Sequence, residues 1–238
     1  MQKDNVLVSS GQKWSFNQEV ADCFDDMLQR SIPGYDTMRE LVTNIGSEFV
    51  KDSFNIIDLG CGNGEGIAPF VHYFGTMQDY YLVDESEPML DICRERYEEL
   101  IRYGMLNVKN MDIRHEFPNV RAGLILSVLT LQFVPIEYRP AILKRVYDHL
   151  KPGGAFILVE KVTCESAELQ NHIANEYYKL KQKNGYSKIQ IENKRESLEG
   201  VMNCLPASWN EDMLRNAGFT KIENFWRHLN FSGWVAIK

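Results

Sequence analysis

Apolar residues recur along the chain at two different spacings, and the spacing predicts which segments form helices and which form strands. Two N-terminal segments, 17–32 and 36–50, carry apolar residues at the spacing of one helix face. Pro33 and Gly34 stand between these segments and indicate a break. Residues 1–15 are mostly polar, and we expect them to pack loosely.

Farther along, short apolar runs alternate with amphipathic segments. The predicted strands cover residues 54–60, 80–86, 107–113, 122–134 (including a loop at its end) and 155–161. The predicted helices cover residues 66–75, 88–104 and 136–154. Strands that alternate with helices favour a parallel sheet with right-handed crossovers. The sequence therefore predicts an α/β fold with a doubly wound, mostly parallel sheet (Rossmann-like).

Two later segments extend this pattern. Residues 164–216 are mostly helical, and we interpret them as a helical cap or dimerisation insert after the fifth strand. Residues 218–238 contain two alternating runs around 230–233, which predicts a C-terminal hairpin that adds antiparallel strands to the sheet edge. We expect residues 1–238 to form one domain.

Charge and cysteine content narrow the class of protein. A formal net charge of −7 argues against a direct nucleic-acid partner, although a small anion in a local basic pocket stays possible. The five cysteines include no CxxC pair, so reduced thiols are expected and no metal site is predicted. No apolar run suits a secretory signal or a membrane span, so we expect a cytoplasmic protein without a membrane partner.

The most specific motif is DLGCGNGEG, residues 58–66, between a predicted strand and a predicted helix. Gly60, Gly62 and Gly64 allow a tight turn and a close ligand approach, and the following helix N-terminus favours a negative group. The dinucleotide fingerprint GxGxxG fits in neither register. The pattern D-x-G-x-G-x-G, which starts at Asp58 and includes Cys61, resembles the first motif of class I S-adenosylmethionine-dependent methyltransferases.

Two acids end the next two predicted strands. Asp84 is placed to accept hydrogen bonds from both hydroxyls of a ribose. Asp112 is placed to accept one from an adenine amino group, with the backbone N–H of Ile113 beside it. Either acid alone is equally well explained as a helix cap or turn residue. Their occurrence at successive strand ends behind the glycine loop favours a nucleoside site.

Other polar residues have simpler explanations. His115 is a candidate general base, but a surface loop position explains it better. The lysines at 179, 181 and 183 are interpreted as a solvated helix face. The basic insert at 184–200 is either a solvated face, with Arg195 pairing locally with Glu192 and Glu196, or a grip for an anion.

Several further stretches narrow the family. They are QRSIPGYD (29–36), TLQFVP (130–135), KPGGAFILVEK (151–161), NGYSKIQIENKRESLEGVM (184–202) and NFSGWVAIK (230–238). Together, from Phe16 to Lys238, the chain resembles the carboxy-S-adenosylmethionine synthase family. The resemblance implies a methyltransferase fold whose activity makes carboxy-S-adenosylmethionine from S-adenosylmethionine and prephenate. In that family a sulfonium ylide captures the carbon dioxide lost by prephenate, and a partner enzyme uses the product on the wobble uridine of tRNA.

The resemblance also implies a set of site residues. Tyr35 and Arg195 would act in catalysis, with Arg195 holding the added carboxylate and reaching it from the neighbouring subunit of a homodimer. Arginine suits that role because its guanidinium is permanently charged and bidentate. The complete set of expected cofactor-binding residues is Tyr35, Asp58, Gly60, Cys61, Gly62, Asp84, Glu85, Ser86, Asp112, Ile113, Val128 and Arg195.

Two positions depart from the family pattern. Gly62 stands where the family usually has serine, and Val128 stands where it has asparagine. These departures favour an alternative, a conventional S-adenosylmethionine-dependent methyltransferase acting on a small molecule. A third hypothesis is a non-catalytic subunit that binds a cofactor or a partner. The family chemistry needs no protein base if the departing hydroxyl of prephenate takes the methyl proton, so catalysis would rest on positioning and electrostatics.

Overall fold

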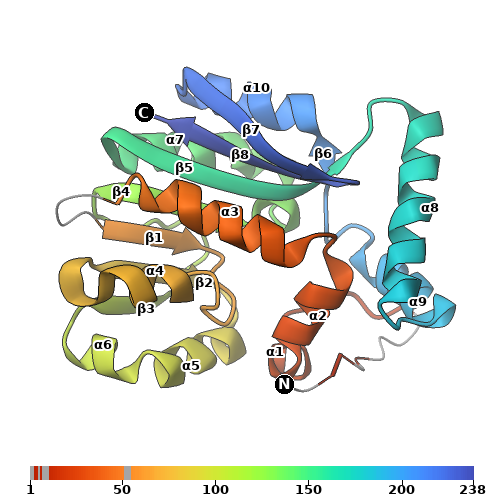
Figure 1. The fold of residues 1–238 in the computed structure, drawn as a ribbon, viewed down its shortest axis with the longest axis horizontal. Coiled ribbons are helices and arrows are strands. Elements are labelled where there is room, and N and C mark those ends of the chain that lie inside the picture. Colours follow the sequence, from red (N-terminus) through yellow and green to blue (C-terminus); the bar gives the residue numbers. More distant parts are fainter. Residues whose placement is uncertain (1–2, 5, 7–10, 51–54) are drawn as a thin grey trace.

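The centre of the fold is a mixed β-sheet (Figure 1). In the computed structural model, which describes residues 3–4, 6, 11–50 and 55–238, this sheet has eight strands. They are β1 (Asn55–Leu59), β2 (Tyr80–Asp84), β3 (Leu106–Asn110), β4 (Ala122–Val128), β5 (Leu150–Thr163), β6 (Leu205–Pro206), β7 (Lys221–His228) and β8 (Phe231–Ile237). The order is β3-β2-β1-β4-β5-β8-β7, with the short β6 paired to β5. Strands β1 to β5 pair in parallel, and β8 is antiparallel to both neighbours, which confirms the predicted fold class.

The helices pack on both faces of this sheet and over one of its edges. They are α1 (Gln18–Asp22), α2 (Phe24–Ser31), α3 (Tyr35–Ser47), α4 (Ala68–Phe74), α5 (Glu87–Arg96), α6 (Glu98–Arg102), α7 (Arg139–His149), α8 (Ala167–Lys183), α9 (Lys188–Leu198) and α10 (Ala207–Ala217). Three short 3-10 turns, η1 (Gly75–Met77), η2 (Leu131–Phe133) and η3 (Ile136–Tyr138), complete the elements of the described residues.

The central strands bury side chains on both faces, as parallel strands between helical layers do. In β1, Ile56 joins the apolar cluster beneath α3 and α4, which contains Phe70. Its neighbour Ile57 joins the opposite cluster beneath α7 and α10, which contains Val146 and Leu214. This alternation of apolar residues explains why the strands read as continuous apolar runs in the sequence.

The carboxyl ends of the parallel strands meet at one edge of the sheet, between β1 and β4. The chain crosses from one side of the sheet to the other at this point, where ligands bind in open α/β folds. Helices α1, α2, α8 and α9 stand beyond this edge and close it off from the side (Figure 1).

The prediction that residues 164–216 form a helical cap is wrong for the C-terminal part of this segment. Only α8 and α9 stand away from the sheet as a cap, whereas α10 packs beside α7 on the face of the sheet. Helix α10 is amphipathic, and its buried Leu214 and Ala217 join the same apolar cluster as α7. A helical pattern alone does not distinguish a cap helix from a helix that covers a sheet.

The expectation of a loose N-terminus is wrong for two of the residues that the structure describes. Asp4 and Trp14 are both buried. The backbone N–H of Asp4 donates to Asp26 at 2.7 Å, and that of Trp14 donates to the carbonyl of Ser197 at 3.0 Å. Residues 1–2, 5 and 7–10 of this segment lie outside the described residues, as does Phe54, which was predicted as strand.

Some element boundaries differ from the prediction. The helix predicted over 88–104 is divided at Tyr97 into α5 and α6, and the first predicted helix is divided at Cys23. Strand β5 begins at Leu150, within the segment predicted as the end of a helix. The hairpin turn lies at Leu229 and Asn230, earlier than predicted. No helix among the described residues has the length and apolarity that a membrane crossing requires.

Candidate functional site

A cavity of about 420 Å³ opens at the carboxyl edge of the sheet, beneath the cap of α8 and α9. It is bounded by the ends of β1, β2 and β4 and by side chains of α2, α3 and α9. The expected site residues that line it are Tyr35, Asp58, Gly60, Cys61, Gly62, Asp84, Glu85, Asp112, Ile113, Val128 and Arg195. Only Ser86 of the expected set is absent from its walls.

The glycine loop leaves no room for side chains where it meets the cavity. Gly60 has φ of 70°, and a Cβ there would lie 2.2 Å from Cγ2 of Thr130. Gly62 has φ of 53°, and a Cβ there would lie 2.8 Å from the ring of Phe24. Glycine is therefore required at both positions for conformational and steric reasons.

The Asp84 carboxylate is fixed by the glycine loop. It accepts hydrogen bonds from the backbone N–H of Gly62 at 2.9 Å and from that of Ser86 at 2.9 Å. Burial raises the pKa of Asp84, and these backbone donors oppose the rise. The hydroxyl of Ser86 instead donates to the carbonyl of Phe16 at 2.6 Å. Ser86 thus positions Asp84 through its backbone, and its side chain is turned to the N-terminal segment.

Asp58, at the end of β1, is a buried carboxyl at the cavity wall. Asp58 is 3% exposed, and burial raises the pKa of its carboxyl to about 7. The charge of Arg39 opposes this rise, and the charge of Asp84 adds to it. A carboxyl held in such surroundings gains from a cationic partner, because the partner would stabilise the ionised form.

Asp112 lies two residues beyond β3 and is engaged by an arginine that the sequence did not single out. Nε of Arg114 donates to both carboxylate oxygens, at 2.8 and 2.9 Å, and this arginine lowers the pKa of Asp112. Arg145 binds the carbonyl of Ile113 at 2.6 Å. The side chain of His115 is 65% exposed, which confirms the interpretation of a surface loop position.

Tyr35 is the first residue of α3, immediately after Gly34, whose φ of 65° turns the chain. Its side chain lines the cavity, and burial raises its pKa to about 12, so the hydroxyl stays protonated. One turn later, Arg39 donates to the carbonyls of Glu65 and Gly66 at 2.7 and 3.0 Å. Helix α3 thus supplies a hydroxyl to the cavity and an arginine that holds the end of the glycine loop.

Val128 ends β4, and its side chain lines the cavity where the family has an amide. The next residue, Leu129, has φ of 61° and donates to the carbonyl of Val159 at 2.6 Å. This turn brings the hydroxyl of Thr130 within 3.3 Å of the carbonyl of Gly60. The sequence placed Thr130 within the stretch at 130–135 but gave it no role, because only the folded turn brings it to the loop.

Arg195, in α9, lines the cavity of its own chain. Nη1 lies 2.7 Å from a carboxylate oxygen of Glu199, and Nη2 lies 3.7 Å from one of Glu196. The predicted local pairing therefore occurs with Glu196 and Glu199, and Glu192 takes no part. With 46% of its side chain exposed, Arg195 is able to exchange these surface partners for a ligand.

Three lysines contribute further cationic groups to the same cavity. They are Lys161 at the end of β5, Lys181 in α8 and Lys194 in α9. The interpretation of Lys181 as part of a solvated face is wrong, because it is 5% exposed. Its position four residues after Tyr177, on the buried side of α8, was the available signal in the sequence.

Comparisons with known proteins agree with this geometry. A family model described as a methyltransferase domain matches residues 56–154. The carboxy-S-adenosyl-L-methionine synthase of Actinobacillus pleuropneumoniae serotype 5b is 32% identical over 243 residues, which cover 100% of both chains. That of Methylococcus capsulatus is 33% identical over 226 residues, or 94% of this chain and 93% of its own. An O-methyltransferase family protein from Burkholderia thailandensis has a similar fold, with a TM-score of 0.66 at 15% identity. That match covers 94% of this chain, which spans only 64% of the Burkholderia protein.

Proposed function

Because the chain belongs to the carboxy-S-adenosyl-L-methionine synthase family and is a transferase that uses S-adenosylmethionine, we propose that it converts S-adenosylmethionine and prephenate to carboxy-S-adenosylmethionine. The observation that carries this proposal is the division of charge within the cavity. Acids line the glycine-loop end, with Arg39 and Arg114 beside them, whereas Arg195 and three lysines line the cap end together with Glu199. One cavity is therefore suited to a cationic cofactor and an anionic second substrate together.

The acidic end fits S-adenosylmethionine group by group. Gly60 lines the cavity with its backbone alone, because Thr130 fills the space of a side chain, and a nucleoside would lie against this backbone. Asp84 would accept the ribose hydroxyls, since its carboxylate is held toward the cavity by backbone donors. Asp58 would pair with the amino group, which would restore its ionised form. Asp112, already oriented by Arg114, and the N–H of Ile113 would receive the adenine edge.

The second substrate would bind between the acidic end and the cap. Arg195 would hold the carboxylate that is transferred, through two parallel hydrogen bonds. Apolar side chains also line the cavity, among them Phe16, Phe24 and Leu28. An enclosed apolar wall would exclude water and keep released carbon dioxide close to the acceptor carbon.

The proposed conversion is balanced in atoms and charge. When bound, S-adenosylmethionine supplies a methyl group that is acidic because of the adjacent sulfonium. Prephenate would lose one carboxylate as carbon dioxide and its hydroxyl as hydroxide, which takes one methyl proton and leaves as water. The carbon dioxide would bond to the methyl carbon, and the aromatic 2-oxo acid phenylpyruvate would remain. The chain's own contribution would be positioning and electrostatic stabilisation, with Tyr35 donating a hydrogen bond to a substrate oxygen.

The proposal also covers the use of the product, the location of the protein and its assembly. We infer that the product serves a tRNA-modifying enzyme, as the family resemblance implies, and that the chain itself needs no nucleic-acid contact. The five free cysteines support a reducing, cytoplasmic location. We further propose one domain over residues 1–238 and a homodimer whose interface includes the cap. Light scattering of the purified protein measures the assembly directly.

A conventional methyltransferase is the alternative, and Val128 favours it because an apolar side chain replaces the family's amide in the cavity wall. The deciding experiment incubates purified protein with S-adenosylmethionine and prephenate and follows the cofactor by mass spectrometry. The proposal expects a product heavier than S-adenosylmethionine by one carboxylate. Arg195→Ala should abolish this product, whereas Arg215→Ala, an exposed arginine with similar local ion pairs on α10, should not. Unchanged cofactor in the wild-type reaction would refute the synthase function.

A further inference from the structure

The cap end of the cavity gathers three ammonium groups from three different elements. Lys161 lies near the C-terminal end of strand β5, Lys181 in α8 and Lys194 in α9, and all three line the cavity. Helices α8 and α9 and the end of β5 converge at this side of the molecule (Figure 1). Chain folding, and not a run of basic sequence, therefore creates this concentration of positive charge.

These lysines have too few anionic partners among the described residues. Lys194 lies 3.8 Å from a carboxylate oxygen of Asp4, which also accepts a hydrogen bond from Tyr186. No described carboxylate lies within 4 Å of the amine of Lys161 or Lys181. Burying a charged amine without an anion is unfavourable. In the part of the chain that the structure describes, Asp4 is thus the one carboxylate within 4 Å of any of the three amines, and it contacts Lys194 alone.

Aromatic rings, instead of acids, surround these amines. The amine of Lys161 lies 4.7 Å from the ring centre of Tyr177 and 5.9 Å from that of Phe231. The amine of Lys181 lies 5.8 Å from the ring centre of Tyr177, and that of Lys194 lies 4.3 Å from that of Trp14. Cation–ring contacts compensate only part of the lost hydration. They also provide flat apolar walls against which a carbon ring can lie.

The pKa values of the lysines also favour a bound anion. Burial, followed by the charges of Lys194 and Lys161, lowers the pKa of Lys181 to about 7. Burial likewise lowers the pKa of Lys194 to about 8, although Asp4 opposes this change. The other charged group facing both amines is Arg30. A bound anion would favour the protonated amines and would relieve their mutual repulsion.

We propose that Lys161, Lys181 and Lys194 form a carboxylate subsite, distinct from Arg195, that holds the part of the second substrate which is not transferred. The ligand class is a small acid with a ring and a side-chain carboxylate, which lies against Tyr177 and Phe231. This assignment rests on the proposed function, in which prephenate carries two carboxylates and transfers one. Arg195 would take the transferred carboxylate, and the three lysines would keep the carboxylate that leaves with the aromatic 2-oxo acid.

The test uses phenylpyruvate, which retains only the second carboxylate, as a binding probe in the presence of S-adenosylmethionine. Lys161→Met and Lys181→Met should each weaken phenylpyruvate binding about tenfold or more, since each removes a charged hydrogen-bond donor. The same variants should raise KM for prephenate and leave S-adenosylmethionine affinity within about twofold. Arg195→Met should weaken carboxy-S-adenosylmethionine binding and leave phenylpyruvate binding intact.

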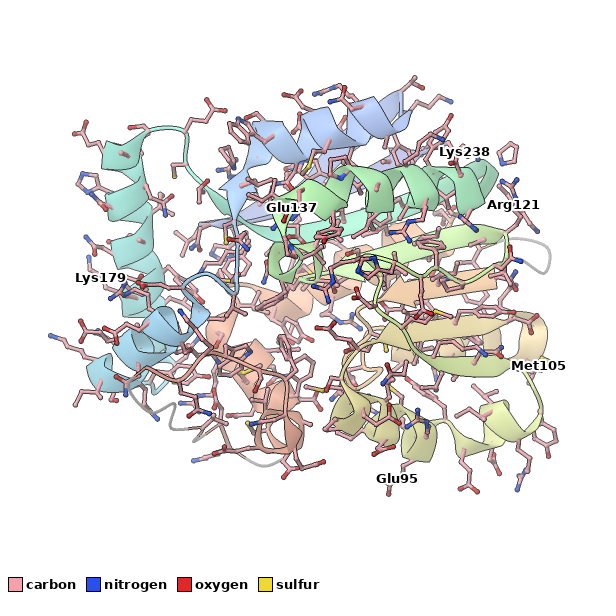
Figure 2. All side chains as sticks on the ribbon, turned by 180° about the vertical axis from the view of Figure 1, so that it is seen from behind. Glu95, Met105, Arg121, Glu137, Lys179 and Lys238 are labelled. Atoms are coloured by element: carbon pink, nitrogen blue, oxygen red, sulfur yellow. The ribbon has the colours of Figure 1, made fainter. Side chains whose placement is uncertain are left out.

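Lys179→Met is the matched control on the same helix. Lys179 is 70% exposed, pairs with Glu176 at 2.7 Å and lies on the outer side of α8 (Figure 2). Its replacement should change neither the Kd for phenylpyruvate nor the KM for prephenate. Thermal melting should show that Lys181→Met is as stable as the wild type, because methionine removes a buried charge and keeps the volume.

The outcomes separate this subsite from the proposed function. Unchanged phenylpyruvate affinity in both lysine variants overturns the subsite, even if the wild type makes carboxy-S-adenosylmethionine. Lysine-dependent phenylpyruvate binding by a wild type that leaves prephenate unreacted supports the subsite and refutes the function. Equal losses in the Lys179 control would also overturn the subsite, because surface charge would then explain the effect.

Discussion

The affinity for S-adenosylmethionine should fall with decreasing pH because of Asp58. Burial raises the pKa of this carboxyl to about 7 in the free protein. A protonated Asp58 offers no charge to the amino group of the cofactor, so binding would require loss of that proton. An α-amino group titrates near 7.7 to 8.0, so the cofactor remains cationic throughout the range from pH 5 to 7.

The size of the effect follows from the position of that pKa. If the cofactor binds only when Asp58 is ionised, the apparent Kd equals the Kd of that ionised form multiplied by a factor. The factor is one plus ten to the power of pKa minus pH. Relative to binding by fully ionised Asp58, the apparent Kd should rise about 11-fold at pH 6 and about 100-fold at pH 5. Arg39 and Asp84 are the charged groups that face Asp58. Because burial also raises the pKa of Asp84, its protonation would steepen the loss at the acid end.

Isothermal titration calorimetry in buffers of different ionisation enthalpy tests this directly, because it counts protons as well as affinity. At pH 6 the wild type should release about 0.9 proton on binding, the fraction of Asp58 that is protonated when free. Asp58→Asn should bind more weakly than the wild type at pH 7, release no proton at pH 6 and vary little in affinity between pH 5 and 7. Proton release in the variant, or a pH-independent Kd in the wild type, would refute the reasoning.

The same carboxyl has a consequence for the stability of the ligand-free protein. Since its pKa is higher folded than unfolded, the folded state binds the extra proton between pH 4 and 7. Stability should therefore fall as pH rises through that window, on the order of 4 kcal/mol for a pKa that rises from 3.8 to about 7. Urea unfolding at pH 5 and 8 should show that Asp58→Asn loses this dependence. The quantity to compare is the difference in unfolding free energy between wild type and variant, because the contributions of other buried groups cancel in it.

Three further predictions test separate parts of the structure. Gly60→Ala should abolish cofactor binding in calorimetry because its methyl group would collide with Thr130, whereas Gly104→Ala, also at positive φ but in open space, should bind normally. Mixing inactive Arg195→Ala and Gly60→Ala chains should restore no synthase activity, since Arg195 lines the cavity of its own chain, and recovered activity would show that it acts on a neighbouring chain. Glu160→Gln should match the wild type in urea unfolding at pH 4 and exceed it at pH 8, because burial raises the pKa of Glu160 from 4.5 to about 8 and across this window the unfolded wild-type chain releases a proton that its folded state retains.

The acidic end of the cavity was predictable from the sequence because parallel topology determines it. Strands in such a sheet end at one edge, so acids that follow successive strands must converge with the glycine loop. Asp58, Asp84 and Asp112 therefore required only correct strand assignments, and small errors in strand length left them in place. The family resemblance supplied Tyr35 and Arg195, which no strand pattern would have identified.

The remaining site residues depend on how separate elements dock. Thr130 meets Gly60 only because Leu129 adopts a left-handed conformation, which its residue type does not suggest. Arg39 reaches the glycine loop only after α3 packs on the sheet. Likewise, α10 has the same amphipathic pattern as a cap helix, and its place beside α7 follows from the hairpin behind it. Local pattern determines which face is buried and leaves the partner of that face undetermined.

The division of charge within the cavity is consistent with the proposed pair of substrates. The chain carries a net charge of −7, so a cationic wall must be concentrated by folding against the average composition. Acids at the strand ends would attract the cationic cofactor, and Lys161, Lys181 and Arg195 at the cap would attract a dianion. The two ligands would then neutralise walls of opposite sign and bring the sulfonium and the transferred carboxylate together at the boundary. A methyl acceptor without charge would leave the lysines unpaired in the complex, which is why the cap end favours an acidic second substrate.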